Sequence, residues 1–244
     1  MTTNTNDAHA LKGARVLIVG GSSGIGLATA LSAQALGARV TIASRSATRL
    51  ASAMETLEGQ AGSAVLDTRD AGAVEKFFTG QEEWDHVVVS AAQTPGGPVR
   101  DLPLDQARSA VESKFWGAYH VARAAKLAEK GSLTFVSGFL SVRPSASSVL
   151  QGGINAALEG LARGLALELA PARVNTVSPG LIDTPLWQAM DEAKRHGMFE
   201  RVSAQLPARR IGTAQDIAQA IIFLMSNGFA TGSSVRVDGG GAIG

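Results

Sequence analysis

A glycine-rich segment near the N-terminus is the part of the sequence best suited to binding a charged ligand. Residues 19–26 read Val-Gly-Gly-Ser-Ser-Gly-Ile-Gly and follow the apolar run Arg15–Val19. Glycines allow a tight turn and let backbone amides approach an anion, and a helix N-terminus favours the same charge. Glycines also occur where a strand simply turns into a helix. Because this segment follows the first strand of an alternating chain, we expect it to bind a dinucleotide pyrophosphate.

The end of the second apolar run indicates which dinucleotide is preferred. It reads Ala-Ser44-Arg45-Ser46 and contains no acidic residue. An acidic side chain would accept the ribose hydroxyls of NAD(H), whereas the planar fork of Arg45 suits a 2′-phosphate. The sequence therefore predicts that NADP(H) is preferred over NAD(H). The alternative is a solvent-exposed arginine that opens the next helix.

Strand-like and helix-like segments alternate along the chain. Seven short β-branched or apolar runs are predicted as strands: Arg15–Val19, Arg39–Ala43, Ala64–Leu66, His86–Ser90, Leu133–Ser137, Arg173–Val177 and Ser234–Val237. Helical patterns follow the glycine-rich loop to about Leu36 and recur at Ser46–Leu57, Gly72–Phe78, Leu104–Glu129, Val149–Leu169 and Ala214–Met225. Apolar strands separated by helices indicate a parallel sheet covered on both faces. We therefore predict a Rossmann-type, doubly wound α/β fold with seven parallel strands in a single domain.

Composition narrows the classes of partner. The 244 residues include no Cys and carry a formal net charge of +1. The four histidines are far apart in sequence, so we expect no metal site: His9, His86, His120 and His196. A net charge this small gives no electrostatic reason to expect nucleic acid or an anionic membrane as a partner. The polar N-terminal residues lack a signal-peptide pattern, and we expect a cytoplasmic protein with a small-molecule substrate.

Two boundaries are predicted within the chain. Residues 1–12 are expected to form a flexible tail, and residues 13–244 the dinucleotide-binding domain. Residues 183–210 interrupt the alternation and carry Trp187, Met190, Met198 and Phe199 among charged residues. Such a segment suits a mobile cover over a substrate pocket, although an ordinary packed helix pair is the alternative.

Several motifs resemble those of the short-chain dehydrogenase/reductase family. They include the G-x-x-x-G-I-G loop, the run Arg173–Gly180 followed by Leu-Ile-Asp-Thr184-Pro, and the C-terminal Arg210-Ile-Gly with Val237-Asp-Gly-Gly240. The resemblance covers nearly the whole chain after residue 12. It implies a homodimer or homotetramer, with Asp67 contacting adenine and with the Ile182 backbone and Thr184 hydroxyl holding the nicotinamide carboxamide. The cofactor-binding residues expected from the loop analysis and the resemblance together are Gly20, Ser22, Ser23, Gly24, Ile25, Gly26, Ser44, Arg45, Asp67, Thr68, Ser90, Ala91, Ala92, Asn155, Pro179, Gly180, Ile182 and Thr184.

The chain departs from the family at all four positions that usually carry catalysis. The family uses an Asn, a Ser, a Tyr and a Lys four residues after the Tyr. Aligning the segment 156–161 with the family places Asn155 at the Lys position and Gln151 at the Tyr position, and counting back places Gly138 at the Ser position. The run Lys114-Phe-Trp-Gly117 matches the family's Asn-x-x-Gly, which places Lys114 at the Asn position. The single tyrosine, Tyr119, belongs to an earlier helix, and no Lys or Tyr occurs between Gly131 and Ala193. Realignment therefore does not restore the usual pair.

The family has Asn on the earlier helix and Lys on the later one, whereas this chain has Lys114 and Asn155 at those positions. The two residue types are therefore exchanged within what we expect to be one site. We hypothesise that Lys114 reaches the space of the family lysine and places a cation beside the nicotinamide ribose. Gln151 would then orient a substrate carbonyl or imine nitrogen without titrating. The alternative is drift in a dead site, with Lys114 extending to solvent.

Polar residues before the later helix offer other replacements for the missing serine. Ser141, Ser145, Ser147 and Ser148 lie there, and Arg143 is a candidate anion anchor, although loop and helix-capping roles are the simpler interpretation.

The sequence thus predicts an NADP(H)-dependent oxidoreductase with a non-standard site. Without a phenol to donate a proton, reduction of simple ketones should be poor, whereas an iminium ion needs only hydride. A quinone or enone delocalises the charge that hydride addition creates. We therefore expect a small, partly apolar carbonyl, imine or conjugated substrate. The alternative is a catalytically inactive NADP(H)-binding sensor or structural subunit.

Overall fold

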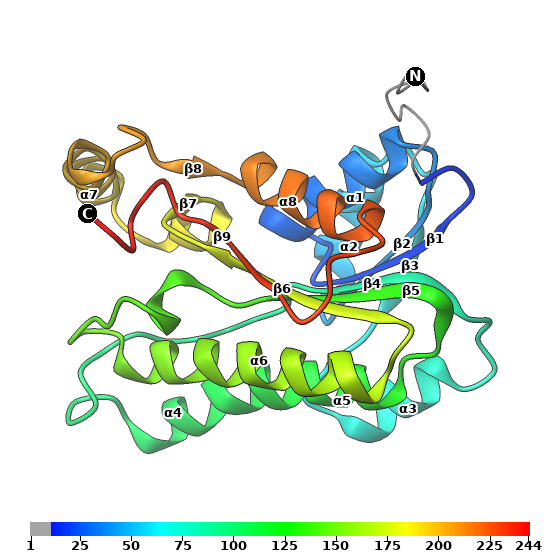
Figure 1. Cartoon of the computed structure of the whole chain (residues 1–244). Coiled ribbons are helices and arrows are strands. Elements are labelled where there is room, and N and C mark those ends of the chain that lie inside the picture. The colour runs from blue at the N-terminus through cyan, green and yellow to red at the C-terminus, as the bar shows by residue number, and fades with distance from the viewer. Residues whose placement is uncertain (1–10) are drawn as a thin grey trace, which may run out of the picture.

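The strands at the centre of the protein are apolar on both faces. In β1 (Arg15–Val19), Leu17 and Val19 point into one core cluster, while Val16 and Ile18 point into another. A strand alternates its side chains between faces, so a continuous apolar run must be covered on both sides. The computed structural model, which describes residues 11–244, shows two helical layers around such a sheet (Figure 1).

The predicted seven-stranded parallel sheet is confirmed, with strand order β3-β2-β1-β4-β5-β6-β9. The remaining strands are β2 (Arg39–Ser44), β3 (Gly62–Val65), β4 (Trp84–Val89), β5 (Leu127–Val136), β6 (Arg173–Pro179) and β9 (Ser234–Val237). The direction of strand order reverses between β1 and β4, and ligands of open α/β sheets bind beyond the carboxyl ends of the strands at such a point.

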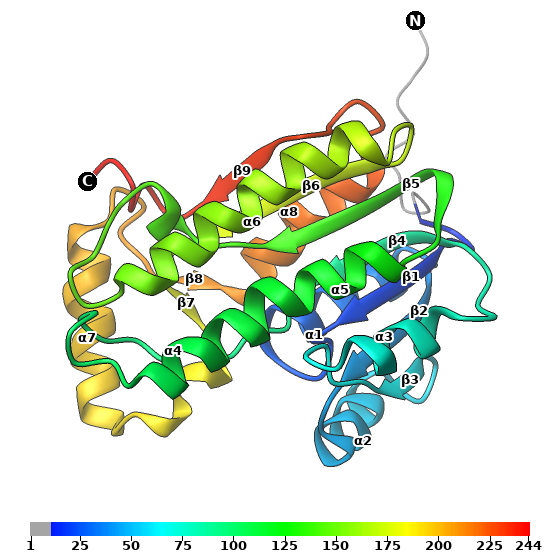
Figure 2. The same cartoon turned by 90° about the horizontal axis from the view of Figure 1, so that it is seen from below.

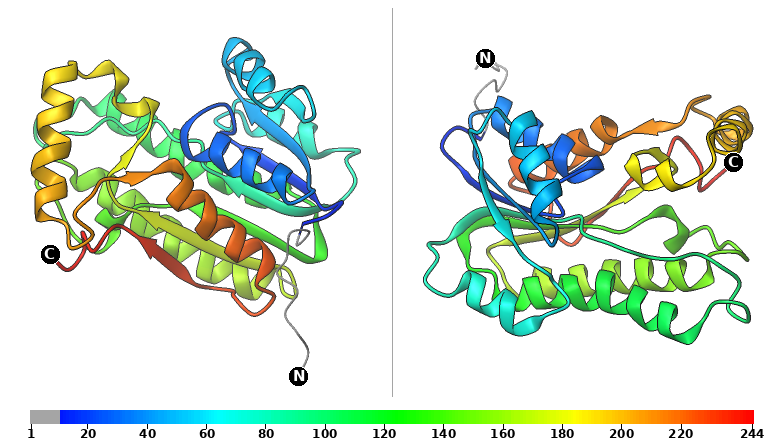
Figure 3. Two further views of the ribbon diagram at one scale, coloured as in Figure 1. Left: turned by 90° about the horizontal axis from the view of Figure 1, so that it is seen from above. Right: turned by 180° about the vertical axis from the view of Figure 1, so that it is seen from behind.

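The helices form two layers. On one face lie α1 (Gly24–Ala35), α2 (Ala47–Thr56) and α8 (Ala214–Ser226); α1 and α8 lie side by side in Figure 3. The other face carries α3 (Ala71–Phe78), α4 (Leu104–Val111), α5 (Gly117–Ala124) and α6 (Val149–Glu168), seen across the sheet in Figure 2. No helix in residues 11–244 has both the length and the apolarity needed to cross a membrane.

The helix predicted over Leu104–Glu129 is wrong in two respects. A π-helical turn, η1 (Glu112–Trp116), separates α4 from α5, and the helix ends at Ala124. Residues 127–129 instead begin β5, where Leu127 pairs with Trp84 of β4. Local helical periodicity extended the prediction too far, because strand pairing with β4 decides the conformation there.

The segment at 183–210 is helical but protrudes from the sheet. A two-stranded ladder, β7 (Ile182–Asp183) with β8 (Gly212–Thr213), ties its ends together around η3 (Pro185–Ala189) and α7 (Glu192–Gln205). No residue of α7 is buried, and Trp187 meets Phe199 edge-on. Figure 3 shows α7 at one end of the molecule.

The boundary predicted after residue 12 needs a small correction. Leu11 is buried in the core cluster of α1 and α8, so the ordered domain includes it. The rest of the predicted tail, residues 1–10, lies outside the described residues.

Two further turns follow the strand ends that position the site. β5 leads into η2 (Phe139–Ser141), which packs on α6. α6 therefore brings Gln151, Asn155 and Glu159, spaced by four residues, to the same side as η1.

Candidate active site

The glycine-rich loop is shaped by close backbone contacts. A Cβ at Gly26 would lie 2.2 Å from the carbonyl oxygen of Gly20, and one at Gly20 would lie 2.5 Å from the amide nitrogen of Ala91. Ser90 and Ala91 complete the packing, since the Ser90 hydroxyl and the Ala91 amide both donate to the Val19 carbonyl. The loop leads into the N-terminus of α1, with Ser23 at its N-cap, and Ile25 is in the first turn. This cradle fits the pyrophosphate of a dinucleotide.

The end of β2 carries the arginine expected to select the cofactor. The Ser22 hydroxyl donates to the Ser44 hydroxyl at 3.0 Å, which joins the glycine-rich loop to this strand. An Arg45 guanidinium nitrogen donates to Gln93 Oε1 at 2.8 Å. Sequence reasoning missed Gln93, which follows Ala92 after β4, because only the tertiary structure places it opposite Arg45.

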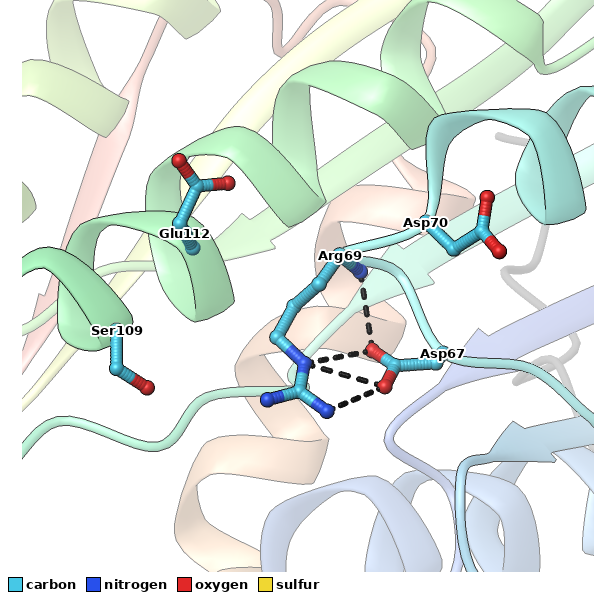
Figure 4. Close-up of a pocket in the computed structure, with 5 residues that line it drawn as sticks. All are labelled: Asp67, Arg69, Asp70, Ser109 and Glu112. Carbon is cyan, nitrogen blue, oxygen red and sulfur yellow. Dashed lines mark hydrogen bonds and ion pairs between the residues drawn. The ribbon is translucent and has the colours of Figure 1, made fainter.

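Asp67 lines a shallow pocket of about 440 Å³ beyond β3, shown in Figure 4 with Arg69, Asp70, Ser109 and Glu112. The Arg69 guanidinium holds Asp67 through a two-pronged contact, with one nitrogen–oxygen distance of 2.5 Å. The hydrogen bonds from Arg69 hold the pKa of Asp67 below its usual value. Asp67 is thus an ionised acceptor at the edge expected for adenine, while neighbouring Thr68 is buried against Gly117 of α5.

Residues from β6 and β7 meet the glycine-rich loop from the other side. A Cβ at Gly24 would lie 3.4 Å from the Thr184 Cβ, so Thr184 borders the loop. Pro179 ends β6, and Gly180 fits closely against Asp238, where a Cβ would lie 2.7 Å from Asp238 Cα. The Ile182 carbonyl already accepts a hydrogen bond from the Trp187 indole at 2.9 Å. The structure therefore places Thr184 directly beside the glycine-rich loop.

Lys114 and Asn155 meet directly. The Lys114 Nζ donates to Asn155 Oδ1 at 2.6 Å and to the Ser137 carbonyl at 2.8 Å. The π-helical turn and the end of β5 bring these groups together, although they are 41 and 23 residues apart in sequence. Burial of the ammonium lowers the pKa of Lys114 to about 8. The alternative in which Lys114 extends to solvent is not what the structure shows.

Gly138 leaves space for this arrangement. A Cβ at that position would lie 2.7 Å from the Asn155 Nδ2. Gln151, one turn before Asn155, donates from Nε2 to the Thr94 carbonyl at 2.6 Å. Its amide nitrogen therefore fixes the loop after β4, and its oxygen is the group left to orient a ligand.

Most of the other polar candidates have different partners. Ser145 and Ser147 hydrogen-bond to each other, and Arg143 donates to the carbonyls of Gly241 and Gly244. Ser148 precedes α6 without a side-chain capping bond. Ser141 alone points to a charged group, Glu159, at 2.7 Å. Sequence reasoning missed Glu159, which is 9% exposed and is reached only through the packing of η2 on α6.

Within residues 11–244, no group of three or more histidine or acidic side chains is arranged to hold a metal ion.

The doubly wound parallel sheet and the glycine cradle beyond its first strand define the class of dinucleotide-binding α/β proteins. A family model described as enoyl-(acyl carrier protein) reductase matches residues 19–241. The short-chain dehydrogenase/reductase fsr5 of Gibberella fujikuroi is 34% identical, over 94% of this chain and 95% of that protein. The chain belongs to the short-chain dehydrogenase/reductase family.

Two solved structures extend the comparison. A small-chain dehydrogenase in complex with NADPH is 36% identical, with a TM-score of 0.82 over 96% of this chain and 100% of that one. An NADPH-bound short-chain oxidoreductase from Pseudomonas aeruginosa PAO1, described as containing an atypical catalytic center, is 27% identical with a TM-score of 0.87. It covers 94% of this chain and 98% of its own.

Proposed function

We propose that this oxidoreductase uses NADP(H) and a non-standard site in which Lys114 supplies the positive charge. The 2.6 Å contact between Lys114 Nζ and Asn155 Oδ1 carries the proposal. It supports a cation beside Asn155, the α6 residue that the resemblance aligns with the family lysine, although Lys114 itself comes from η1. A similar protein with an atypical catalytic center supports the idea that the family tolerates such a change.

The preference for NADP(H) rests on Arg45 and on the relatives. Arg45 stands at the end of β2, where no carboxylate competes for a ribose hydroxyl. Its guanidinium can pair with a 2′-phosphate, and Ser44 lies next to it. Both similar structures described above are NADPH complexes.

The residues of the site divide the work of hydride transfer. The bound dinucleotide would supply or accept the hydride. Lys114 has three N–H donors, of which two bind Ser137 and Asn155, so one remains for an oxygen or nitrogen that gains negative charge. In a partly buried position this cation stabilises such charge more than it would in water. Gln151 orients the same group through its amide oxygen.

The absence of a phenol at Gln151 limits the substrate class. A small, partly apolar imine, quinone, enone or activated carbonyl needs less help from a proton donor than a simple ketone does. The segment 183–210, with Trp187 and Phe199 in contact, would cover this substrate. No residue of α7 is buried, which favours movement of the segment 183–210 relative to the sheet.

A matched pair of lysine variants tests the proposal. We expect wild-type protein to bind NADPH, measured by fluorescence, and to oxidise it with a member of a panel of imines, quinones, enones and ketones. Lys114→Met should lower turnover by about 10²–10⁴-fold, whereas Lys76→Met, at an exposed position of α3, should not. Unchanged turnover in Lys114→Met overturns the role of Lys114. Tight NADPH binding without turnover on any class identifies a sensor instead.

The homo-oligomer implied by the resemblance also remains a proposal. Large exposed apolar side chains support it, notably Leu167 on α6, Phe223 on α8 and Phe229 after it. Light scattering at several concentrations should show a dimer or tetramer, and a monomer throughout would contradict it.

A further inference from the structure

A buried carboxylate lies behind the Lys114–Asn155 contact. Glu159 follows Asn155 by four residues on α6, so both side chains lie on the same side of the helix. Its Oε1 accepts hydrogen bonds from the Ser137 hydroxyl at 3.0 Å and from the Ser141 hydroxyl at 2.7 Å. Burying a carboxylate is costly, and both the two hydroxyl donors and a cation nearby lower that cost.

Ser137 connects this carboxylate to Lys114. Its carbonyl oxygen accepts from Lys114 Nζ, while its hydroxyl donates to Glu159, and the residue is itself buried. One residue therefore sets the spacing between a cation and an anion that do not touch. The resulting arrangement joins η1, the end of β5 and α6, three elements that are distant in sequence.

The charged surroundings of Lys114 are simple. Glu159 is the charged group that acts on it from α6, while Asn155 and Ser137 are its uncharged hydrogen-bond partners. Glu112, on the same helical turn as Lys114, lines the pocket around Arg69 instead. Burial favours loss of the Lys114 proton, and the attraction of Glu159 opposes that loss.

We propose that Glu159 is the counter-charge of Lys114, positioned through Ser137, and that it keeps Lys114 an ammonium ion under working conditions. Glu159 is thus a positioning residue, since it acts through Lys114. This inference rests on the proposed function for its catalytic consequence, but the pairing itself is a property of the protein alone. Ser141 holds the same carboxylate oxygen as Ser137 through a second hydrogen bond.

The direct test measures the titration of Lys114 without cofactor or substrate. Protein carrying ¹³C-labelled lysine is titrated by NMR, and the Lys114 signal is assigned by its loss in Lys114→Met. The chain contains few lysines, which makes the assignment practical. We expect wild-type Lys114 to titrate with a pKa of about 8. In Glu159→Gln the midpoint should fall by about one pH unit, because the neutral amide no longer favours the charged form.

Two further variants separate charge from structure. Glu159→Asp keeps the charge at a greater distance, so the midpoint should fall by less than in Glu159→Gln. It also keeps the test available if the glutamine variant does not fold. Ser141→Ala leaves the charge in place and should shift the midpoint least. Identical Lys114 midpoints in wild type, Glu159→Gln and Glu159→Asp overturn the inference, even if melting temperatures differ.

The pH dependence of turnover gives the second readout. If protonated Lys114 is the active form, activity falls as pH rises above its pKa of about 8, and the fall should begin at lower pH in Glu159→Gln. At pH 6 both proteins should hold Lys114 protonated and turn over at similar rates. If the proposed function is wrong, Lys114→Met will not change turnover. If only this inference is wrong, Lys114→Met will still lower turnover, but Glu159→Gln will not shift the Lys114 midpoint.

Discussion

The dinucleotide half of the site is built from backbone and small residues, whereas the Lys114 half is built from side chains. In the first half, Gly20 and Gly26 approach other backbone atoms so closely that no Cβ fits. In the second, the Lys114 side chain binds Asn155 and the Ser137 carbonyl, and the Ser137 hydroxyl binds Glu159. Backbone packing tolerates no substitution without movement of the strands. Side chains can exchange positions, provided that charges and hydrogen bonds remain balanced.

The largest effect is expected from Gly26→Ala. The new Cβ would lie 2.2 Å from the Gly20 carbonyl oxygen, so the turn must shift. NADPH affinity should fall by about 100-fold or more, and the free energy of unfolding by about 1–3 kcal/mol. Fluorescence titration and thermal unfolding measure the two effects.

Gly164→Ala is the matched control for that variant. Gly164 is exposed on α6 with nothing near its Cβ position. The free energy of unfolding should rise by about 0.5–1 kcal/mol with NADPH affinity unchanged. Equal losses in both variants would show that the glycine cradle is not the sensitive part of the dinucleotide half.

Arg45→Ala tests a side chain within the dinucleotide half. Loss of the pairing with a 2′-phosphate should weaken NADPH binding by about 10–100-fold and leave NADH binding nearly unchanged. Arg49→Ala, on the exposed side of α2, is the control and should change neither. Wild-type protein that binds both cofactors equally would contradict the predicted preference.

Gly138→Ala should have the smallest effect on the site. Its Cβ would meet the Asn155 Nδ2 at 2.7 Å, and a side chain can yield where backbone cannot. Turnover should fall by about 3–10-fold with little change in NADPH affinity, since the Lys114–Asn155 contact is disturbed. Gly153→Ala, in open space on α6, serves as control. The same turnover in Gly138→Ala, Gly153→Ala and wild type would show that Gly138 and Asn155 are not coupled.

The fold was more predictable than the side-chain network. All seven strands of the sheet were predicted, because runs such as Arg15–Val19 are rich in apolar and β-branched residues and alternate with helical patterns. The π-helical turn η1 after Val111 was not predicted, nor was the start of β5 at Leu127. Both depend on contacts with distant elements, which residue periodicity does not contain.

The candidate site was predictable in part. The family resemblance implies an Asn at the position of Lys114 and a Lys at the position of Asn155, which predicts that the two residues share one site. The structure places these two side chains in contact. Gln93 and Glu159 gave no such signal. Their roles follow from Arg45 and Ser137, which only the folded chain brings to them.

The sequence by itself determined the sheet, the glycine-rich loop and the absence of tyrosine from α6, since these depend on residue type, spacing and local periodicity. Only the tertiary structure decided which hydrogen bonds and charges surround Lys114. Hydrogen bonds across η1, β5 and α6 place Lys114, Ser137 and Glu159 in one buried arrangement. Such long-range contacts form only when packing removes these groups from water, because a buried charge must find its partners within the fold.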